Sequence, residues 1–484
     1  HNLDLLVGYE INSKESDGLG TTISNFARWD KPEVNNGVVY QSMGGSNSTT
    51  RIVSYITRAN YDYDNKYYLG ASWRTDGSSR LARENRWGNF WSLSGAWRVS
   101  SESFMKPLQN WLSDLKLRVS YGVNGTLPSS YYGYMGLSSL TSNYNDNPGI
   151  TQSQLENKEL TWETNYNFNS GIDLGFFDNR LNVTFEYYVR TTKNLLYSRP
   201  LSLATGFSSY LANIGKLQNK GYELEIRSTN IETKDFRWST SLNLGHNANK
   251  ILKLDGDLKQ VTSGTSIHKV GLPYSTYYMI EFAGIDPVDG EPMFYKNTTD
   301  ENGNLNKETT KDPRSAEKVI LQCADPTITG GLGNSISYKW FDLNFNVNFS
   351  FGAWNYDGAA GKLEHGGDGT LNIPIYYRKR WQKEGDETSI ERFVVGRSIS
   401  MTDYATTRRL YSGDYVRLKN LTFGFTLPKT WTRKVGIDNI RLYASGNNLL
   451  TWAAYDYIDP ESGSSPSWDT PPMRTYTFGL EVKF

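Results

Sequence analysis

The chain has 484 residues and equal numbers of basic and acidic side chains, so its formal net charge is zero and no nucleic-acid partner is predicted. Its single cysteine, Cys323, excludes an intrachain disulfide framework and a cysteine-rich metal site. No apolar run reaches the roughly 18 residues of a transmembrane helix, but a membrane-spanning strand needs only every second residue to be apolar. The chain opens on strand-like sequence without a signal peptide, so we expect a mature chain or a fragment.

Fourteen segments along the chain alternate apolar and polar residues, the period-two pattern of strands with one apolar and one polar face. Many are longer than the usual five or six residues and suit the roughly 9–11 residues with which a tilted strand crosses a bilayer. In chain order, the expected strands are 2–12, 51–62, 66–76, 87–100, 112–124, 160–175, 180–193, 219–230, 234–248, 327–338, 341–353, 415–427, 438–450 and 474–484.

The pattern is clearest at 341–351, where Phe, Leu and Val alternate with Asp, Asn and Ser without interruption. The last strand also alternates and ends on an aromatic residue, which resembles the recognition signal for assembly into the outer membrane. A plain apolar strand end is the alternative interpretation. The residues of this predicted assembly signal are Tyr476, Phe478, Leu480, Val482 and Phe484.

The connections between the expected strands alternate between short and long along the whole chain. The shorter ones are 62–66, 101–111, 176–179, 231–234, 339–340 and 428–437, and the long ones are about 125–159, 194–218, 249–326, 354–414 and 451–473. Bacterial outer-membrane barrels show this alternation, with short periplasmic turns and long extracellular loops. Soluble β-sandwich domains are the alternative, but they have no reason to keep every second connection short. If the last strand ends in the periplasm, fourteen strands place the start of the first one there too, so an even number of strands would precede it.

Several stretches resemble, in order and spacing, the C-terminal barrel region of the SusC/RagA family of TonB-dependent transporters. The resemblance covers nearly the whole chain, and the ordered set is more specific than any one piece. The stretches are YDYDNKYYLGASWRTDGSSR (61–80), NRWGNFWSLSGAWRVSSESFM (85–105), LSDLKLRVSYGVNGT (112–126), NKELTWETNYNFNSGIDLGFFDNRLNVTFEYYVRTTKNLL (157–196), NKGYELEIRS (219–228), SGDYVRLKNLTFGFTLP (412–428), RLYASGNNLLTW (441–452) and DPES (459–462).

The resemblance implies an all-β fold, a transmembrane antiparallel β-barrel in the bacterial outer membrane. The family has about 22 strands and an N-terminal plug, so residues 1–484 would be the C-terminal portion of one barrel domain without its plug. We expect a separate N-terminal barrel and plug segment to complete it. The resemblance further implies active import driven by TonB through that segment, with a SusD-like surface lipoprotein as a lid and an oligosaccharide or peptide as the ligand.

No constellation for catalysis, a cofactor or a metal is evident in the sequence. The histidines His1, His246, His268 and His365 are scattered, and the acid-rich stretches 286–292 and 300–304 resemble calcium loops but lack the full ligand pattern, so we expect turns there. No nucleophile motif such as G-x-S-x-G appears. The chain is therefore not expected to be an enzyme.

The long loops combine aromatic and polar residues, which suits sugar rings and peptide backbones about equally well. We predict contacts to substrate or to the lid partner from Trp354, Tyr356, Tyr376, Tyr377, Trp381, Tyr277 and Tyr278, while packing within the loops is the alternative. On the strands, Glu186, Arg190 and the asparagines 344, 346 and 348 are expected to face the lumen. A passive porin, an outer-membrane hydrolase and a structural or adhesion barrel remain as alternative functions, and the sequence does not distinguish glycan from peptide.

Overall fold

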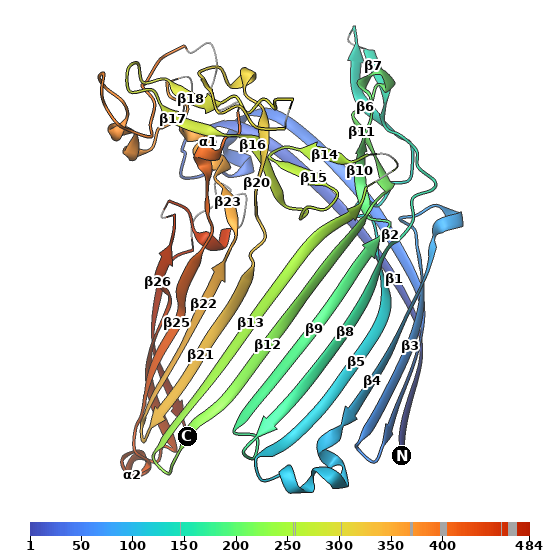
Figure 1. Cartoon of the computed structure of the whole chain (residues 1–484), viewed down its shortest axis with the longest axis vertical. Helices are drawn as coiled ribbons and strands as arrows, with labels where there is room; N and C mark the ends of the chain where they lie inside the picture. Colours follow the sequence, from blue (N-terminus) through green and yellow to red (C-terminus); the bar gives the residue numbers. More distant parts are fainter. Residues whose placement is uncertain are drawn as a thin grey trace. The chain divides into compact units, whose positions relative to one another are not determined.

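The computed structural model describes residues 1–484 except 146, 255, 257, 302, 368–370, 397–403, 456 and 463–471. Its main element is a 14-stranded sheet in which the strands are hydrogen-bonded in their order along the chain (Figure 1). These strands are β1 (Asn2–Phe26), β2 (Gly37–Tyr63), β3 (Tyr67–Ser78), β4 (Trp87–Arg98), β5 (Leu112–Thr126), β8 (Glu163–Phe176), β9 (Leu181–Lys193), β12 (Lys216–Glu232), β13 (Phe236–Lys253), β21 (Ile328–Tyr338), β22 (Phe341–Phe351), β25 (Tyr415–Thr426), β26 (Asn439–Ala453) and β27 (Thr475–Lys483). Each of the fourteen predicted strands is confirmed.

The long connections contain small sheets of their own. They are formed by β6 (Leu137–Tyr144) with β7 (Asn147–Gln154), by β10 (Leu196–Pro200) with β11 (Ser209–Asn213), by β14 (Gln260–Ser263), β15 (Ser266–Lys269), β16 (Thr276–Ile280) and β20 (Lys318–Cys323), by β17 (Phe282–Ile285), β18 (Pro292–Tyr295) and β19 (Thr309–Thr310), and by β23 (Trp354–Tyr356) with β24 (Leu410–Ser412). Sequence analysis treated these segments as loops, because strands of two to eight residues leave too few alternations to recognise.

The helices are short and lie in the connections. Among the described residues, the α-helices are α1 (Gly358–Leu363) and α2 (Lys429–Thr432), and the 3-10 helices are η1 (Val34–Asn36), η2 (Arg83–Asn85), η3 (Val99–Ser101), η4 (Ser103–Leu108), η5 (Leu203–Thr205), η6 (Pro313–Ser315), η7 (Ile375–Lys379), η9 (Thr407–Arg409), η10 (Arg433–Val435) and η11 (Pro460–Ser462). Across the described residues, no helix has the length and apolar character needed to cross a membrane.

The chain divides into two compact units. The interpretation of residues 1–484 as part of one barrel domain stays a prediction. The first unit comprises His1–Arg98, Arg118–Ser170 and Val189–Leu217, and the second comprises Val99–Leu117, Gly171–Tyr188 and Gln218–Phe484. In the first unit, Leu81, Phe90, Leu160 and Trp162 form a buried apolar cluster. In the second, Ile280 and Phe294 form a smaller cluster beside Phe282 and Tyr404.

The register of the strands shows why alternation specifies this sheet. In β22, Asn344, Asn346 and Asn348 lie opposite Ser335, Gly333 and Gly331 of β21, so small and polar residues share one face. We call it the polar face, and the opposite side, with Phe345 and its neighbours, the apolar face. A shift by one residue would exchange the two faces, so the pattern fixes the pairing.

One polar residue of β21 lies on the apolar face, and its side-chain oxygen is hydrogen-bonded there. Asn334 is opposite Phe345. Its side-chain oxygen accepts hydrogen bonds from Trp238 Nε1 at 2.9 Å and from Thr240 Oγ1 at 2.8 Å. A polar group in an apolar environment is costly only when its hydrogen bonds are unmade, so the Trp238 and Thr240 donors make Asn334 tolerable.

Three of the short connections are tight turns in which non-glycine residues adopt left-handed backbone. Asp64 and Asn65 have φ of 53° and 52°, Asp178 and Asn179 have 55° and 62°, and Lys339 has 50°. Asp and Asn tolerate this region better than most residues because their short polar side chains bond locally. The predicted tight turns at 62–66, 176–179 and 339–340 are therefore confirmed.

Strands β1 and β2 are much longer than predicted. Beyond Ile11 they continue as a paired two-stranded ribbon, in which Lys14 lies opposite Thr50 and Gly20 opposite Gly44. Sequence analysis ended the first strand at residue 12 because apolar residues no longer alternate beyond it. Backbone pairing persists there without an apolar face, since the hydrogen bonds of a ladder do not require one.

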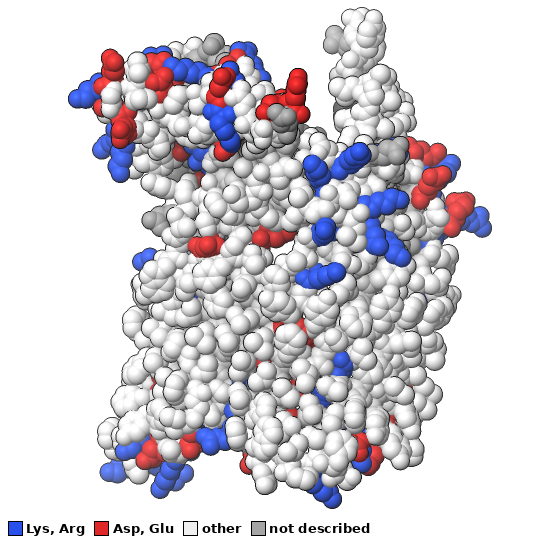
Figure 2. Space-filling view, in the orientation of Figure 1, with Lys and Arg blue, Asp and Glu red and all other residues white. Residues whose placement is uncertain are grey.

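Charged side chains gather away from the middle of the strands. On the face shown in Figure 2, Lys, Arg, Asp and Glu lie mainly over the long connections and at the short turns, and the strand surface between them is mostly uncharged. This distribution suits strands whose middle lies in hydrocarbon, where a charged side chain is costly.

We predict that a charge on the apolar face of β22 is far more costly than one on its polar face. In bilayer vesicles, Phe345→Arg should lower the free energy of unfolding by about 2–4 kcal/mol, because an arginine near the middle of the hydrocarbon loses its hydration. The control, Asn346→Arg, projects from the other face and should cost less. Equal losses in urea titrations of the two variants would contradict the assignment of the faces.

Candidate functional site

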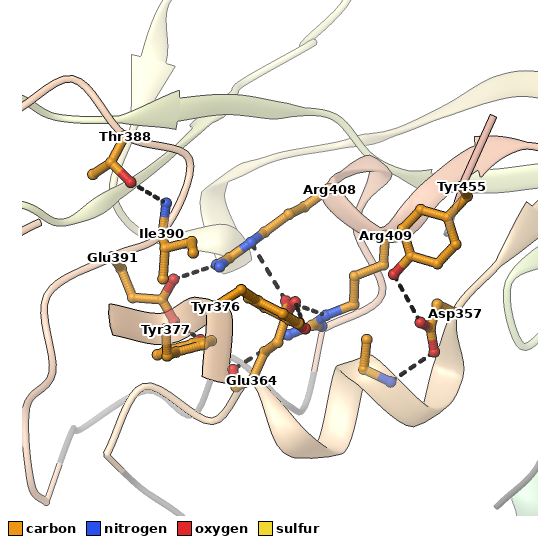
Figure 3. A network of polar contacts seen from close by, with 11 residues as sticks. Asp357, Glu364, Tyr376, Tyr377, Thr388, Ile390, Glu391, Arg408, Arg409 and Tyr455 are labelled. Carbon is orange, nitrogen blue, oxygen red and sulfur yellow. Dashed lines mark hydrogen bonds and ion pairs between the residues drawn. The ribbon is translucent and has the colours of Figure 1, made fainter. Parts of the chain in front are cut away.

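The candidate site lies in the second unit, where two long connections, the one between β22 and β25 and the one between β26 and β27, meet in a network of polar contacts (Figure 3). Its centre is the pairing of Glu364 and Glu391 with Arg408 and Arg409. Arg408 bonds Glu391 through Nη1 and lies 3.6 Å from Glu364 through Nε, while Arg409 Nε lies 3.2 Å from the same Glu364 oxygen. All four side chains are buried, with exposed fractions between 0% and 11%. Two positive and two negative charges compensate each other, which buried ions require.

Two adjacent tyrosines complete the hydrogen bonds of the two glutamates. The Tyr376 hydroxyl donates to Glu364 Oε1 at 2.6 Å, and the Tyr377 hydroxyl donates to Glu391 Oε1 at 2.8 Å. Burial, together with the neighbouring carboxylates, raises the pKa of both Tyr376 and Tyr377 above the ordinary tyrosine value. Both therefore stay neutral hydrogen-bond donors. The charges of Glu391 and Glu364 outweigh burial and raise the pKa of Arg408, which stays charged.

The six-residue helix α1 positions acidic residues at both its ends. Asp357 is its N-cap and accepts the Ala360 backbone N–H at 2.7 Å, while Glu364 is its C-cap. The second Asp357 oxygen accepts the Tyr455 hydroxyl at 3.0 Å. A cap of this kind satisfies an otherwise unpaired backbone donor. Asp357 thus starts the helix and also connects it to the last long connection.

An aromatic cluster adjoins this network. Tyr455 stacks on Tyr411 with ring centroids 3.8 Å apart, and Tyr457 contacts both Tyr455, at 5.3 Å, and Tyr376, at 4.9 Å. Tyr457 is 65% exposed, whereas the other three rings are partly buried. The cluster therefore presents one open tyrosine face supported by three fixed rings, an arrangement that can stack on a planar or ring-shaped ligand.

A second buried arginine connects the last long connection to the sheet. Arg417 of β25 is 2% exposed and donates to Asp459 at 2.6 Å, to Glu461 at 2.7 Å and to Thr451 at 3.0 Å. Lys419 adds a second cation, 2.6 Å from Glu461. Two cations and two carboxylates again balance, so the 459–462 segment is held against β25 by bonds that would leave unpaired charge if broken.

The acid-rich stretch 286–292 is a turn, as predicted, and its carboxylates pair with cations of the chain. Asp286 and Asp289 lie 2.6 and 2.7 Å from Lys311, and Glu291 lies 2.7 Å from Arg392. The hydrogen bonds from Lys311 lower the pKa of both Asp286 and Asp289. In the described part of the chain, no group of three His, Cys, Asp or Glu residues could hold a metal ion.

The predicted contact residues differ widely in exposure. Tyr277 and Tyr377 are buried, at 3% and 1% exposed, whereas Trp354, Tyr356, Tyr376, Trp381 and Tyr278 are partly exposed. Trp381 packs over Gly290 and donates a hydrogen bond through Nε1 to the Pro287 carbonyl oxygen at 3.0 Å. It therefore holds the long loop between β22 and β25 against the 286–291 turn. Only the partly exposed rings could touch a ligand or lid in this conformation. Whether any of them does so stays a prediction.

Four residues of the predicted assembly signal, Tyr476, Phe478, Leu480 and Val482, lie on β27 and on its apolar face, and Phe484 follows directly after the strand. They are exposed, with Phe478 at 82% and Phe484 at 89%. Their proposed recognition by the assembly machinery is not tested by this placement and stays a prediction.

Sequence reasoning missed the charged residues that organise the site. Arg408 and Glu391 are 17 residues apart, and Arg409 and Glu364 are 45 apart, in segments without regular periodicity. For Arg417 the sequence did contain a usable signal. Arg417 and Lys419 on β25 are two residues apart, and so are Asp459 and Glu461 in the DPES segment. Only the fold reveals that these pairs meet.

Comparisons with known proteins agree with this architecture. A family model described as TonB dependent receptor-like, beta-barrel, matches residues 2–449. TonB-dependent receptor P3 of Formosa agariphila is 33% identical to the chain, covering 100% of the chain and 51% of that receptor. TonB-dependent receptor SusC of Bacteroides thetaiotaomicron is 30% identical over 90% of the chain and 44% of that receptor.

A solved structure, that of the RagAB peptide transporter, superposes with a TM-score of 0.85 at 29% identity. The superposition covers 100% of the present chain and 53% of the matched chain of the transporter. The chain thus spans about half the length of the relatives it matches. These matches confirm the predicted fold class, and the relatives are receptors and transporters rather than enzymes.

We predict that Arg408→Met loosens the network strongly. Removing this cation leaves the fully buried Glu391 without its charge partner, so the local free energy of opening at 375–392 should fall by about 3–5 kcal/mol. Arg314→Met is the matched control, because Arg314 is 63% exposed beside Asp312 and water screens the attraction in such a pair, so that it contributes little. Hydrogen exchange of the two variants measures the difference, and indistinguishable protection at 375–392 would contradict the buried role of Arg408.

A pH effect is expected at His268, which is buried in β15 and stacks on Tyr274 with ring centroids 4.2 Å apart. Burial lowers the pKa of His268 below its ordinary value of 6.5. The folded state therefore binds the proton less readily than the unfolded state does, so stability is full above about pH 6.5 and declines as pH falls below it. Hydrogen exchange of 260–280 should quicken from about pH 7.5 to about pH 5 after correction for the intrinsic rate. His268→Phe keeps an aromatic ring against Tyr274 and should remove the pH dependence of exchange. If the pH dependence is unchanged in this variant, another group causes it.

Proposed function

The chain belongs to the TonB-dependent receptor β-barrel family, and we propose that it forms part of an active importer of an oligosaccharide or oligopeptide. The barrels of this family reside in the bacterial outer membrane. The observation that supports the proposal most is the likeness, along the whole chain, to the structure of the RagAB peptide transporter, together with 30% identity to SusC. The fourteen strands would be the C-terminal portion of one barrel of about 22 strands.

The mechanism that we propose assigns different tasks to the two ends of the strands. Ligand would be captured between the long connections and a SusD-like surface lipoprotein that acts as a lid. A plug supplied by an N-terminal segment would then rearrange when TonB pulls on it. Energy must reach the site mechanically, since the outer membrane has no nucleotide supply.

The loop network supports this proposal through its rigidity. Buried charge pairs hold α1 (Gly358–Leu363) and the segment 375–392 to η9 (Thr407–Arg409), and Arg417 holds the segment 459–462 to β25. A capture surface whose supports are fixed loses less conformational entropy when ligand or lid binds. The partly exposed rings of Trp354, Tyr356 and Tyr376 lie on this framework. They are the contacts that we propose for ligand or lid.

Uptake measurements test the proposed function. A strain that lacks the gene should lose saturable uptake of one labelled class, oligosaccharide or oligopeptide, and the full-length gene should restore it. Retention of both uptakes in the deletion strain, with no other receptor induced, would contradict the proposal. The class that is lost identifies the substrate.

We predict that Trp354→Ala weakens capture. Truncation of an aromatic contact typically costs about 1–3 kcal/mol, or roughly fivefold to 150-fold in apparent affinity. Trp340→Ala is the matched control, because Trp340 is 46% exposed in the short turn between β21 and β22, at the other end of these strands. The apparent affinity of uptake, or of lid association in detergent, should change for Trp354→Ala alone. Equal affinities for both variants would remove Trp354 from the capture surface.

A further inference from the structure

A hollow in the apolar face of β2–β5 has a floor of small residues. Ala59 of β2 lies opposite Ala71 of β3, which lies opposite Leu93 of β4. In the adjacent row, Leu69 of β3 lies opposite Gly95 of β4. Two alanines and a glycine thus take positions where longer apolar side chains would fill the surface, and larger residues surround them.

The hollow is open and its walls are apolar. Its volume is about 540 Å³, and it lies entirely within the first unit. Leu69, Leu93 and Val119 form its walls and are 60%, 56% and 50% exposed, with Tyr121 at 42% beside them. An engineered apolar cavity of about 150 Å³ already binds benzene, so this groove has room for a considerably longer apolar group.

Aromatic rings border the groove at both ends along the strands. Toward the long connections, Trp73 lies opposite Trp91. Toward the short turn at 64–65, Tyr67 stacks on Trp97 with ring centroids 6.4 Å apart, and Tyr63 lies 6.2 Å from Tyr67. Aromatic residues gather at the boundary between hydrocarbon and headgroups. The Tyr63, Tyr67 and Trp97 rings therefore mark the headgroup level on the short-turn side.

The groove opens on the face that meets the membrane. The neighbouring residues of the same strands, Ser72 and Ser92, project from the polar face, where their hydroxyls lie 2.7 Å apart. Alternation therefore places Ala71 and Leu93 on the apolar face. Because these barrels reside in the outer membrane, the apolar face contacts bilayer hydrocarbon.

We propose that this groove is a binding site for one acyl chain of a phospholipid from the leaflet on the short-turn side. Within the bilayer, an acyl chain gains no hydrophobic free energy by leaving other lipid chains for an apolar protein surface. Retention of the acyl chain in the groove therefore depends on van der Waals contact. A chain lying in a groove touches protein on several sides, whereas a chain on a smooth strand surface touches it on one. The chemistry of the walls favours no polar ligand, and the headgroup would lie beside Tyr63, Tyr67 and Trp97.

Photo-crosslinking tests the position of the bound lipid. The full-length receptor in vesicles is labelled with phosphatidylethanolamine that has a diazirine in one acyl chain, and the adducts are mapped by mass spectrometry. We expect adducts to concentrate on peptides of β3 (Tyr67–Ser78) and β4 (Trp87–Arg98). Adducts spread evenly over the apolar-face strands would overturn the proposal, and so would crosslinks between two copies of the receptor at these peptides.

Variants at Gly95 test whether the groove itself retains the lipid. A Cβ at this position would lie 3.8 Å from Leu69 Cδ2 and 4.0 Å from Val119 Cγ1, so a side chain enters the groove without a clash. Gly95→Leu should lower phosphatidylethanolamine retention, measured by native mass spectrometry, by roughly tenfold, because it displaces several methylene contacts. Gly95→Ala, which leaves most of the groove open, should retain the lipid.

Ala444→Leu is the matched control on the apolar face, because Ala444 of β26 lies opposite Phe423 and Phe478. It should retain phosphatidylethanolamine as the unsubstituted receptor does. Both variants are first shown to be folded by the heat-modifiability of their electrophoretic mobility. Equal retention of phosphatidylethanolamine by Gly95→Leu and Ala444→Leu would then refute the proposed site. Retention is measured without nutrient ligand, so this outcome is independent of whether the receptor imports.

Discussion

The constraint on which the structure depends is that hydrocarbon offers no hydrogen-bond partner to the backbone. Every strand that crosses it must therefore pair with a neighbour, and every side chain facing it must be apolar or satisfied internally. The 14-stranded sheet meets the first requirement by pairing strands in chain order, except at the outer edges of β1 and β27, which have no neighbour within the sheet among the described residues. The strict alternation of β22 meets the second. Asn334, the exception in β21, has its side-chain oxygen bonded by Trp238 and Thr240.

Outside the strands the same problem has a different solution. Buried ion pairs hold segments of the long connections in place, Arg408 with Glu391 and Arg417 with Asp459. Such pairs are not a strong source of net stability, because desolvation offsets much of their attraction. They are specific, however, since any other arrangement leaves a buried charge unpaired. We infer that they fix the geometry of the surface that we propose for ligand capture.

Sequence reasoning succeeded where one short-range rule governs the structure. Period-two alternation located β22, and Asp64 and Asn65 located a turn, because each depends on neighbouring residues only. It failed at the β1–β2 ribbon, where backbone pairing continues through Lys14 and Thr50 without an apolar pattern. It also could not anticipate that Tyr377 is buried against Glu391, because that contact depends on how two loop segments fold together.

The central claim is that this chain belongs to an energised importer and not to an open pore. Its most direct test is uptake of the labelled nutrient by intact cells before and after collapse of the inner-membrane proton gradient. An importer coupled to TonB should bind the ligand at the surface in both conditions but accumulate it only while the gradient is present. Accumulation in the periplasm at the same rate after the gradient has collapsed would contradict the account and indicate a passive channel.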